Sequence, residues 1–359
     1  MKKCCLGREA PDAICDSILV CPANIGLCCE SSLRKVVKSK LLSISTVIGI
    51  SQMASRIAVI LFLSSLTFAG VIEDVRGAIA QNNFSAADSE LQAYRTQHGI
   101  DPEYLEALSW MARGSLAARQ LDHALDYSRQ TQTLVAQQLK KVQLDSSAHL
   151  ALALGAAFEV RAQVLAARGQ RSQAVSLLQG ALETYGKTSI RARLQKNLNL
   201  LNLVHQPAPP LDIKQHLGSA PPAPLSKLKG SPVLLFFWAH WCGDCKGEAP
   251  IIARLRSEYA SQGLVVMGPT QLYGYAARGE EVSAPQELSY IEAVRQRYYS
   301  GLLDIPVPVS ASNFDVYGAS TTPTLVLIDR SGRVALYHPG AMSYDDLRSA
   351  IQGAIKPAS

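Results

Sequence analysis

Cysteine is scarce over most of this 359-residue chain. Six of its eight cysteines lie within the first 29 residues, and the next 212 residues contain none. The remaining two are Cys242 and Cys245. A chain of this length can bury a core without disulfide crosslinks, and two domains are expected for it. The distribution therefore argues against a disulfide scaffold and singles out one closely spaced pair.

Strong net charge and recurring long apolar runs are also missing. The net charge is only +6 and 48% of the residues are hydrophobic, which excludes a wholly disordered chain. Uncharged stretches of roughly 20 residues do not recur, which argues against a polytopic membrane protein. Residues 70–359 hold 27 Lys and Arg against 25 Asp and Glu, so no nucleic-acid partner is expected.

Residues 53–69 have the pattern of a secretory signal peptide. Met53 and Arg56 precede an uncharged, mostly apolar run that ends in Thr67-Phe68-Ala69, with small residues where a signal peptidase acts. We therefore expect Met53 to be the true start and residues 1–52 to be a mis-assigned or leader extension. Residues 70–359 are then extracytoplasmic, either periplasmic or secreted.

A membrane anchor is the alternative interpretation of the N-terminus. It keeps residues 1–52 and joins the apolar residues 41–50 to residues 57–69 across Arg56. The early cysteines could also bind metal or carry a lipid, but their spacing matches no usual zinc pattern.

Proline is nearly absent from residues 71–204, where Pro102 is the only one. Apolar residues there recur at helical spacing, and Gly and Asn-Asn points punctuate them. Similar units carry central alanines 37 and 50 residues apart, at Ala87, Ala124 and Ala174. This pattern predicts an α-helical domain of paired antiparallel helices that resembles tetratricopeptide repeats. Such a domain either docks a protein partner or only supports its neighbour.

The chain changes character after residue 204. Residues 205–228 are rich in proline and predict an extended linker. Within residues 229–359, Val233–Ala239 reads as a strand buried on both faces, and the order predicted from there is β-α-β-α-β-β-α. The fold class expected is an α/β domain with a mixed sheet flanked by helices, preceded by an all-α domain.

The two remaining cysteines follow the buried strand directly, in Trp241-Cys242-Gly243-Asp244-Cys245. Three residues are about one helical turn, so the two side chains share a face and suit a disulfide. Cys242 would lie at a helix N-terminus, which favours the reactive thiolate. We assign Cys242 as the nucleophile and Cys245 as the resolving cysteine.

Two structural alternatives exist for this pair. Zinc would need two further ligands, and the chain beyond the leader offers no other cysteine and no paired histidines. A stapling disulfide gains stability from a long closed loop, which this spacing does not provide. No metal is therefore expected, and no cofactor beyond a redox-active disulfide.

Residues 233–340 resemble the thioredoxin fold and, within it, the extracytoplasmic TlpA/ResA-like thiol-disulfide oxidoreductases. The resemblance rests on Phe237–Pro250, which fits W-C-x-x-C-x-x-E-x-P, and on Thr321-Thr322-Pro323-Thr324. It implies that the Thr322–Pro323 bond is cis and lies beside Cys242, where Thr322 and Pro323 meet an incoming peptide. It further implies protein dithiol or disulfide substrates and a thiol electron donor, expected in the membrane.

Other residues of the motif receive roles on the same basis. Glu248 stands where the family places an acid, and a partly buried carboxylate could exchange a proton with Cys245. Its alternative is a solvated helix residue. Trp241 is expected to cover the cysteines and contact substrate. Gly243 and Asp244 would tune the redox potential, with the Asp244 charge opposing the thiolate.

One departure from the family is the long stretch Pro269–Ser320. Its tyrosines and glycines indicate either a mobile loop that sets partner choice or a plain surface loop.

The function expected is an exported oxidoreductase that reduces protein disulfides. A helical partner-binding protein with an incidental redox domain is the rival. A peroxiredoxin-like peroxidase is disfavoured, because residue 239 is Ala where that chemistry needs Thr or Ser.

Overall fold

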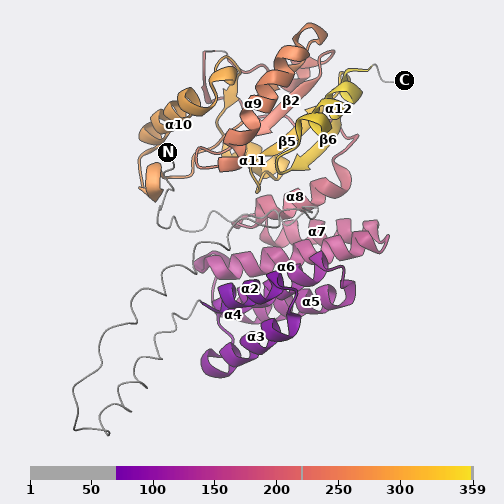
Figure 1. Ribbon diagram of the computed structural model, residues 1–359, viewed down its shortest axis with the longest axis vertical. Coiled ribbons are helices and arrows are strands. Elements are labelled where there is room, and N and C mark those ends of the chain that lie inside the picture. The colour runs from indigo at the N-terminus through magenta and orange to yellow at the C-terminus, as the bar shows by residue number, and fades with distance from the viewer. Residues whose placement is uncertain (1–69, 220, 357–359) are drawn as a thin grey trace, which may run out of the picture.

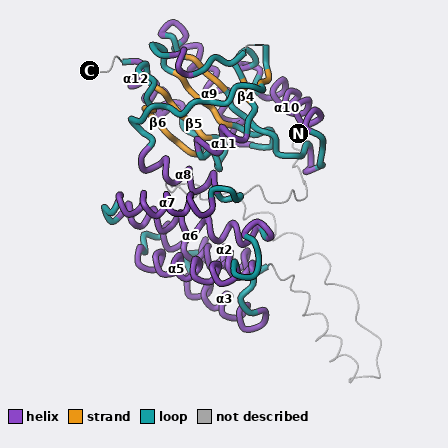
Figure 2. Tube along the Cα trace, turned by 180° about the vertical axis from the view of Figure 1, so that it is seen from behind, coloured by secondary structure: helices purple, strands orange, loops and turns teal. Residues whose placement is uncertain are grey.

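The computed structural model describes residues 70–219 and 221–356. The expected signal peptide or anchor and the extension before it lie outside these residues. Helices alone make up the part up to residue 202, and strands occur only after it within the described chain. Figure 1 shows the helical part in indigo and magenta, with the sheet-containing part in orange and yellow. Figure 2 shows the same division from behind. The predicted fold class, helices followed by a mixed α/β part, is confirmed.

The helical part consists of seven α-helices in the described chain. Two begin at caps that the sequence makes recognisable: Asn83 accepts a hydrogen bond from the Ala86 N–H, and Asp101 accepts one from Tyr104, just before Pro102. The helices are α2 (Val71–Ala80), α3 (Phe84–His98), α4 (Pro102–Ala117), α5 (Leu121–Gln138), α6 (Ala148–Ala167), α7 (Arg171–Tyr185) and α8 (Arg191–Asn202).

Three helical hairpins have turns of the same geometry. In each turn the residue following the left-handed position donates its N–H to a carbonyl five residues earlier, which closes the helix C-terminus. The left-handed residues are Asn82, Arg119 and Gly169. Five residues after each comes a completely buried alanine, namely Ala87, Ala124 or Ala174. The alanines noticed in the sequence therefore occupy equivalent positions in hairpins α2–α3, α4–α5 and α6–α7.

Helix α6 is the one described helix long and apolar enough to cross a membrane by length and composition. It packs against α4, α5, α7 and α8, and Leu150, Leu154 and Val164 lie in its buried surface. The position of α6 among these neighbours is that of a core helix in the helical part.

The second part is built on a four-stranded mixed sheet in the order β3-β2-β5-β6. Strand β2 pairs in parallel with β3 and antiparallel with β5, and β5 pairs antiparallel with β6. The strands are β2 (Val233–Phe237), β3 (Val265–Met267), β5 (Thr324–Ile328) and β6 (Val334–Pro339); the helices are α9 (Gly243–Glu258), α10 (Ala284–Tyr298), α11 (Ala311–Tyr317) and α12 (Tyr344–Ile355).

Both faces of β2 are covered, because every residue of this strand is buried. Leu234 and Phe236 face a cluster that includes residues of α9, α10 and α12. Val233, Leu235 and Phe237 face the opposite cluster, which includes α11. The continuous apolar run in the sequence thus corresponds to the centre of a three-layer arrangement, and its end delivers the chain to the cysteine motif.

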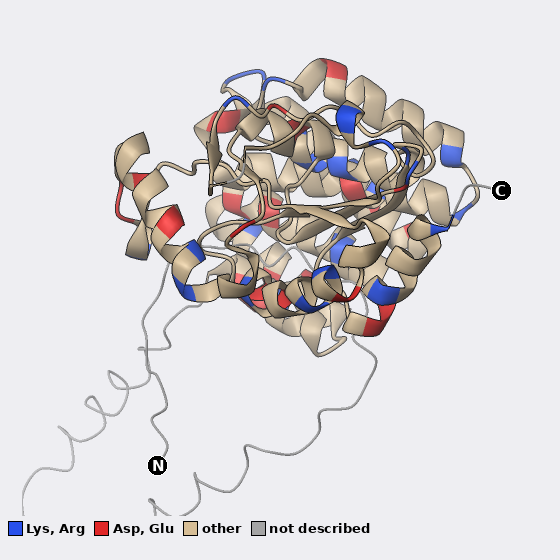
Figure 3. Cartoon of the chain, turned by 90° about the horizontal axis from the view of Figure 1, so that it is seen from above, with Lys and Arg blue, Asp and Glu red and all other residues tan. Residues whose placement is uncertain are grey.

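Much of the proline-rich segment is extended and lies along the sheet, but the predicted extended linker is wrong at its end, where Leu225–Leu228 form a 3-10 helix. The backbone of the extended part pairs with the start of β6: His205 donates to the Val334 carbonyl, and Val334 donates back to Gln206. Further on, a two-residue strand β1 (His216–Leu217) pairs with β4 (Val307–Pro308). Viewed from above, basic and acidic residues both occur across the elements of the molecule (Figure 3).

Candidate active site

Cys242 and Cys245 form a disulfide at the start of α9, with their Cα atoms 5.3 Å apart. Cys242 is the N-cap residue, and its Sγ accepts a hydrogen bond from the Cys245 N–H at 3.0 Å. The unpaired N–H groups of a helix start favour negative charge, so this position stabilises a thiolate on Cys242 after reduction. Cys242 is 3% exposed and Cys245 is completely buried; Gly243 and Asp244 between them are exposed.

A second loop lies against the disulfide. The Thr322–Pro323 peptide bond is cis, as expected, and the Thr322 carbonyl oxygen lies 3.4 Å from the Cys242 Sγ. The Thr322 hydroxyl is buried and has no hydrogen-bond partner among the described residues. Thr322 and Pro323 therefore stand beside Cys242, and the Thr322 side chain keeps an unused hydrogen-bonding group there.

Glu248 follows Cys245 by three residues on α9 and is 2% exposed. Side chains at this spacing share a helix face. The carboxylate accepts a bond from the Met342 N–H, at 3.3 Å to Oε1 and 3.2 Å to Oε2. Burial raises the pKa of Glu248 to about 7; the Met342 N–H opposes this shift and the Asp244 charge adds to it. Glu248 is thus a buried group that changes protonation near neutral pH, rather than a solvated helix residue.

Trp241 is 37% exposed, which makes it one of the few large apolar side chains open to solvent in the described chain. Its ring packs edge-on against Tyr273, with 5.6 Å between the ring centroids. Tyr273 comes from the long stretch between β3 and α10. One wall of the site is therefore aromatic and contributed by a segment 32 residues further along the chain.

Behind this wall lies a buried pair that the sequence did not reveal. His240 and Glu287 each have side chains only 1% exposed, with 3.4 Å between His240 Nε2 and Glu287 Oε1. Three tyrosine rings pack edge-on around the imidazole, with centroids 5.2 to 5.5 Å away: Tyr273, Tyr275 and Tyr290. Burial lowers the pKa of His240, and the Glu287 carboxylate opposes this shift.

Glu287 also ties the long stretch to α10. Its two carboxylate oxygens accept bonds from the backbone N–H groups of Tyr273 at 2.6 Å and Gly274 at 2.8 Å. A glutamate in the first turn of a helix is ordinary in a sequence, so no sequence signal distinguished Glu287. No group of three or more His, Cys, Asp or Glu side chains placed to hold a metal occurs in residues 70–219 and 221–356.

A family model described as the AhpC/TSA family matches residues 204–271. The thiol-disulfide oxidoreductase ResA of Geobacillus thermodenitrificans is 26% identical over 135 residues, covering 37% of this chain and 68% of the relative. The thiol:disulfide interchange protein DsbE of Xylella fastidiosa is 29% identical over 116 residues, covering 32% of this chain and 51% of that protein.

Among solved structures, a protein described as a thiol:disulfide interchange protein DsbE from Chlorobium tepidum covers 43% of this chain and 98% of its own length. Its sequence identity is 25% and its TM-score is 0.34. Residues 204–271 of this chain are therefore similar to the AhpC/TSA family, and the C-terminal part is similar to the ResA thiol-disulfide oxidoreductases.

Proposed function

We propose that this protein is an exported oxidoreductase that reduces disulfides in extracytoplasmic proteins through Cys242 and Cys245. The observation that carries the proposal is the position of Cys242 at the N-cap of α9, bonded to Cys245. A disulfide that closes so short a loop contributes little stability. Its placement at a helix start, on a helix that also carries the buried acid Glu248, suits thiol-disulfide exchange.

Reduction of a substrate follows two exchange steps. The Cys242 thiolate attacks one sulfur of the substrate disulfide, forms a mixed disulfide and releases the other substrate sulfur as a thiolate. The Cys245 thiolate then attacks the Cys242 sulfur, which forms the Cys242–Cys245 disulfide and releases the second substrate thiolate. Two electrons pass to the substrate, and the two protons from the cysteines end on its thiols. A thiol donor, proposed to be membrane-bound, restores the pair.

Glu248 supplies the proton exchange that the second step needs. The buried Cys245 must lose its proton to attack and regain it when the pair is reduced again. A carboxyl group with a pKa of about 7 one helical turn away can accept and return a proton near neutral pH. Trp241, Thr322 and Pro323 form the proposed substrate contact, in which the exposed Trp241 ring covers the cysteines.

The proposal also covers the direction of the reaction, reduction of the substrate, and the extracytoplasmic location of the protein. The exposed Asp244 charge disfavours the thiolate and so favours a reducing pair; Gly243, the other residue between the cysteines, is proposed to tune the potential with it. Export rests on the signal-like residues 53–69. The hairpins are proposed to offer a docking surface for a protein partner.

The test is reduction of insulin by the dithiol form of the protein. We expect wild-type protein to reduce insulin and Cys242→Ala to be inactive, while Cys245→Ala accumulates a mixed disulfide that gel electrophoresis detects. In the reduced protein, iodoacetamide should label Cys242 faster than Cys245 at neutral pH. Equal inactivity of wild type and Cys242→Ala would instead support the rival function, a helical partner-binding protein.

A further inference from the structure

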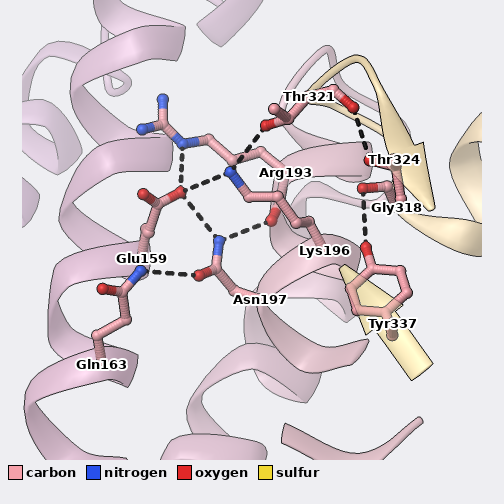
Figure 4. A network of polar contacts seen from close by, with 9 residues as sticks. All are labelled: Glu159, Gln163, Arg193, Lys196, Asn197, Gly318, Thr321, Thr324 and Tyr337. Atoms are coloured by element: carbon pink, nitrogen blue, oxygen red, sulfur yellow. Dashed lines mark hydrogen bonds and ion pairs between the residues drawn. The ribbon is translucent and has the colours of Figure 1, made fainter. Parts of the chain in front are cut away.

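Helix α8 buries polar side chains where a helix joining two parts of a protein usually buries apolar ones. Arg193, Lys196, Asn197 and Asn199 are each 3 to 6% exposed, on a helix of 12 residues. Burying such groups costs free energy unless each finds a partner. Their partners come from both sides of α8; Figure 4 shows those of Arg193, Lys196 and Asn197.

On the side of the helical part the partner is Glu159 of α6. The carboxylate oxygen Oε2 accepts from Arg193 Nε at 3.0 Å and from Asn197 Nδ2 at 3.0 Å, and it lies 3.3 Å from Lys196 Nζ. Burial alone would raise the pKa of Glu159, but Arg193 and Lys196 hold this pKa well below its ordinary value. The ammonium of Lys196 is therefore paired with a buried carboxylate that is ionised at neutral pH.

On the other side α8 reaches the segment that leads into the active site, residues 316–323. Asn199 Nδ2 donates to the Tyr317 carbonyl at 3.0 Å, and Tyr337 of β6 donates to the same carbonyl at 2.8 Å. Lys196 Nζ donates to Thr321 Oγ1 at 3.5 Å. At Gly318, where φ is +60°, an added Cβ would lie 2.2 Å from the Lys196 backbone nitrogen. The segment and α8 are in direct backbone contact.

The contacts form a continuous path to the reactive sulfur. Two hydrogen bonds hold Thr321. Its hydroxyl accepts from Lys196 Nζ, and its carbonyl accepts from the Thr324 hydroxyl at 2.6 Å. The next residue is Thr322, whose carbonyl oxygen lies 3.4 Å from the Cys242 Sγ. A shift of Thr321 therefore also moves the Thr322 carbonyl oxygen relative to the Cys242 Sγ, because only one peptide unit separates them.

We propose that Lys196 is a positioning residue for the active site: anchored by Glu159 of the helical part, it holds Thr321 and thereby sets the place of Thr322 beside Cys242. This inference rests on the proposed function and extends it, because it gives the helical part a role in the redox site. The hairpins then act on the chemistry through α8 whether or not they also dock a partner.

The experiment compares Lys196→Met and Thr321→Val with wild type. Lys196→Met keeps the length of the side chain and leaves Glu159 paired with Arg193; Thr321→Val removes only the receiving hydroxyl. Loosening Thr322 moves a carbonyl dipole away from the Cys242 sulfur, which exposes the sulfur and favours its thiolate. We expect iodoacetamide to label Cys242 of the reduced protein about fivefold faster in each variant, the effect of losing one hydrogen bond.

Three further measurements make the result specific. The double variant should label at the same rate as either single variant, because both substitutions remove the same contact between Lys196 and Thr321. Lys196→Arg should restore the labelling rate to within about twofold of wild type, since the cation is retained. The exposed Lys140→Met is the matched control and should label as wild type does. The KM for insulin should rise in the two variants more than kcat changes.

Unchanged labelling of Cys242 in Thr321→Val would overturn the inference, and so would additive effects in the double variant. Thr321→Val decides the question even where Lys196→Met fails to fold. Labelling needs no substrate, so it also separates this inference from the proposed function. If wild-type protein reduces no insulin, the proposed function fails, while faster labelling in both variants still supports the positioning role of Lys196.

Discussion

Glu248 carries a carboxyl group that the fold removes from water one helical turn after Cys245. Its pKa of about 7 lies above the ordinary value of 4.5, so the folded protein binds this proton more tightly than the unfolded chain. The contribution of Glu248 to stability is therefore complete below pH 4.5 and is lost as the pH rises to about 7.

We expect Glu248→Gln to remove this pH dependence. Between pH 4.5 and 8, the free energy of unfolding of the wild type should fall relative to that of the variant by about 3 kcal/mol. Urea unfolding of the oxidised proteins at both pH values measures the difference. Glu183→Gln, on the exposed surface of α7, is the control and should follow wild type. Parallel pH profiles of Glu248→Gln and wild type would show that Glu248 ionises normally.

Single residues also show how far the sequence predicts this site. The cysteine pair at a helix start is a local pattern, so Cys242 and Cys245 could be assigned from neighbouring residues alone, and the cis bond at Pro323 followed from a family resemblance. The Met342 N–H that meets Glu248 lies 94 residues away in sequence, and Thr321 lies 125 residues from Lys196. Contacts at such separations leave no mark in a single sequence.

At the scale of elements, the strands of the four-stranded sheet and the longer helices were predicted, even the three-residue β3, whereas β1, β4 and α11 were not. Strand β2 and helices α9 and α12 have long apolar patterns or clear boundaries. Strands β1 and β4 have two residues each, and α11 has seven, too few for a repeat of period 2 or 3.6 to emerge. Such elements form because tertiary contacts hold them.

Helix α10 is the element that gives the long stretch between β3 and β5 a fixed attachment. Glu287 accepts two backbone N–H groups from Tyr273 and Gly274 and stands beside His240. We expect Glu287→Gln to lose part of this attachment, because an amide offers one acceptor oxygen in place of two. A buried N–H left without an acceptor costs about 1–3 kcal/mol.

Two measurements report on this attachment. Urea unfolding should show the lower stability of Glu287→Gln, and trypsin should cleave after the exposed Arg278 faster than in wild type. Glu280→Gln, an exposed carboxylate on the same stretch, serves as control for both. Equal cleavage of Glu287→Gln and wild type would mean that the aromatic packing around His240 holds the stretch without Glu287.

The whole molecule joins a redox domain to helical hairpins through α8, and the proposal of export applies to both. If residues 53–69 are a signal peptide, the mature protein begins near residue 70 and retains only Cys242 and Cys245. N-terminal sequencing of protein isolated from the producing cell should then find a start close to Gly70. A start at Met1 would support the anchor instead, because it retains both apolar segments, residues 41–50 and 57–69.

Gly318 lies in backbone contact with α8, where the two parts of the molecule meet. Any side chain there would meet the backbone of α8 at Gln195 and Lys196, and a backbone has no alternative rotamer by which to move aside. Residue 318 is thus closed to other amino acids for as long as α8 stays docked. In a related sequence, glycine at this position would be a signature of a chain whose helical part is seated in the same way. A larger residue would identify a chain that seats its helices differently or has none.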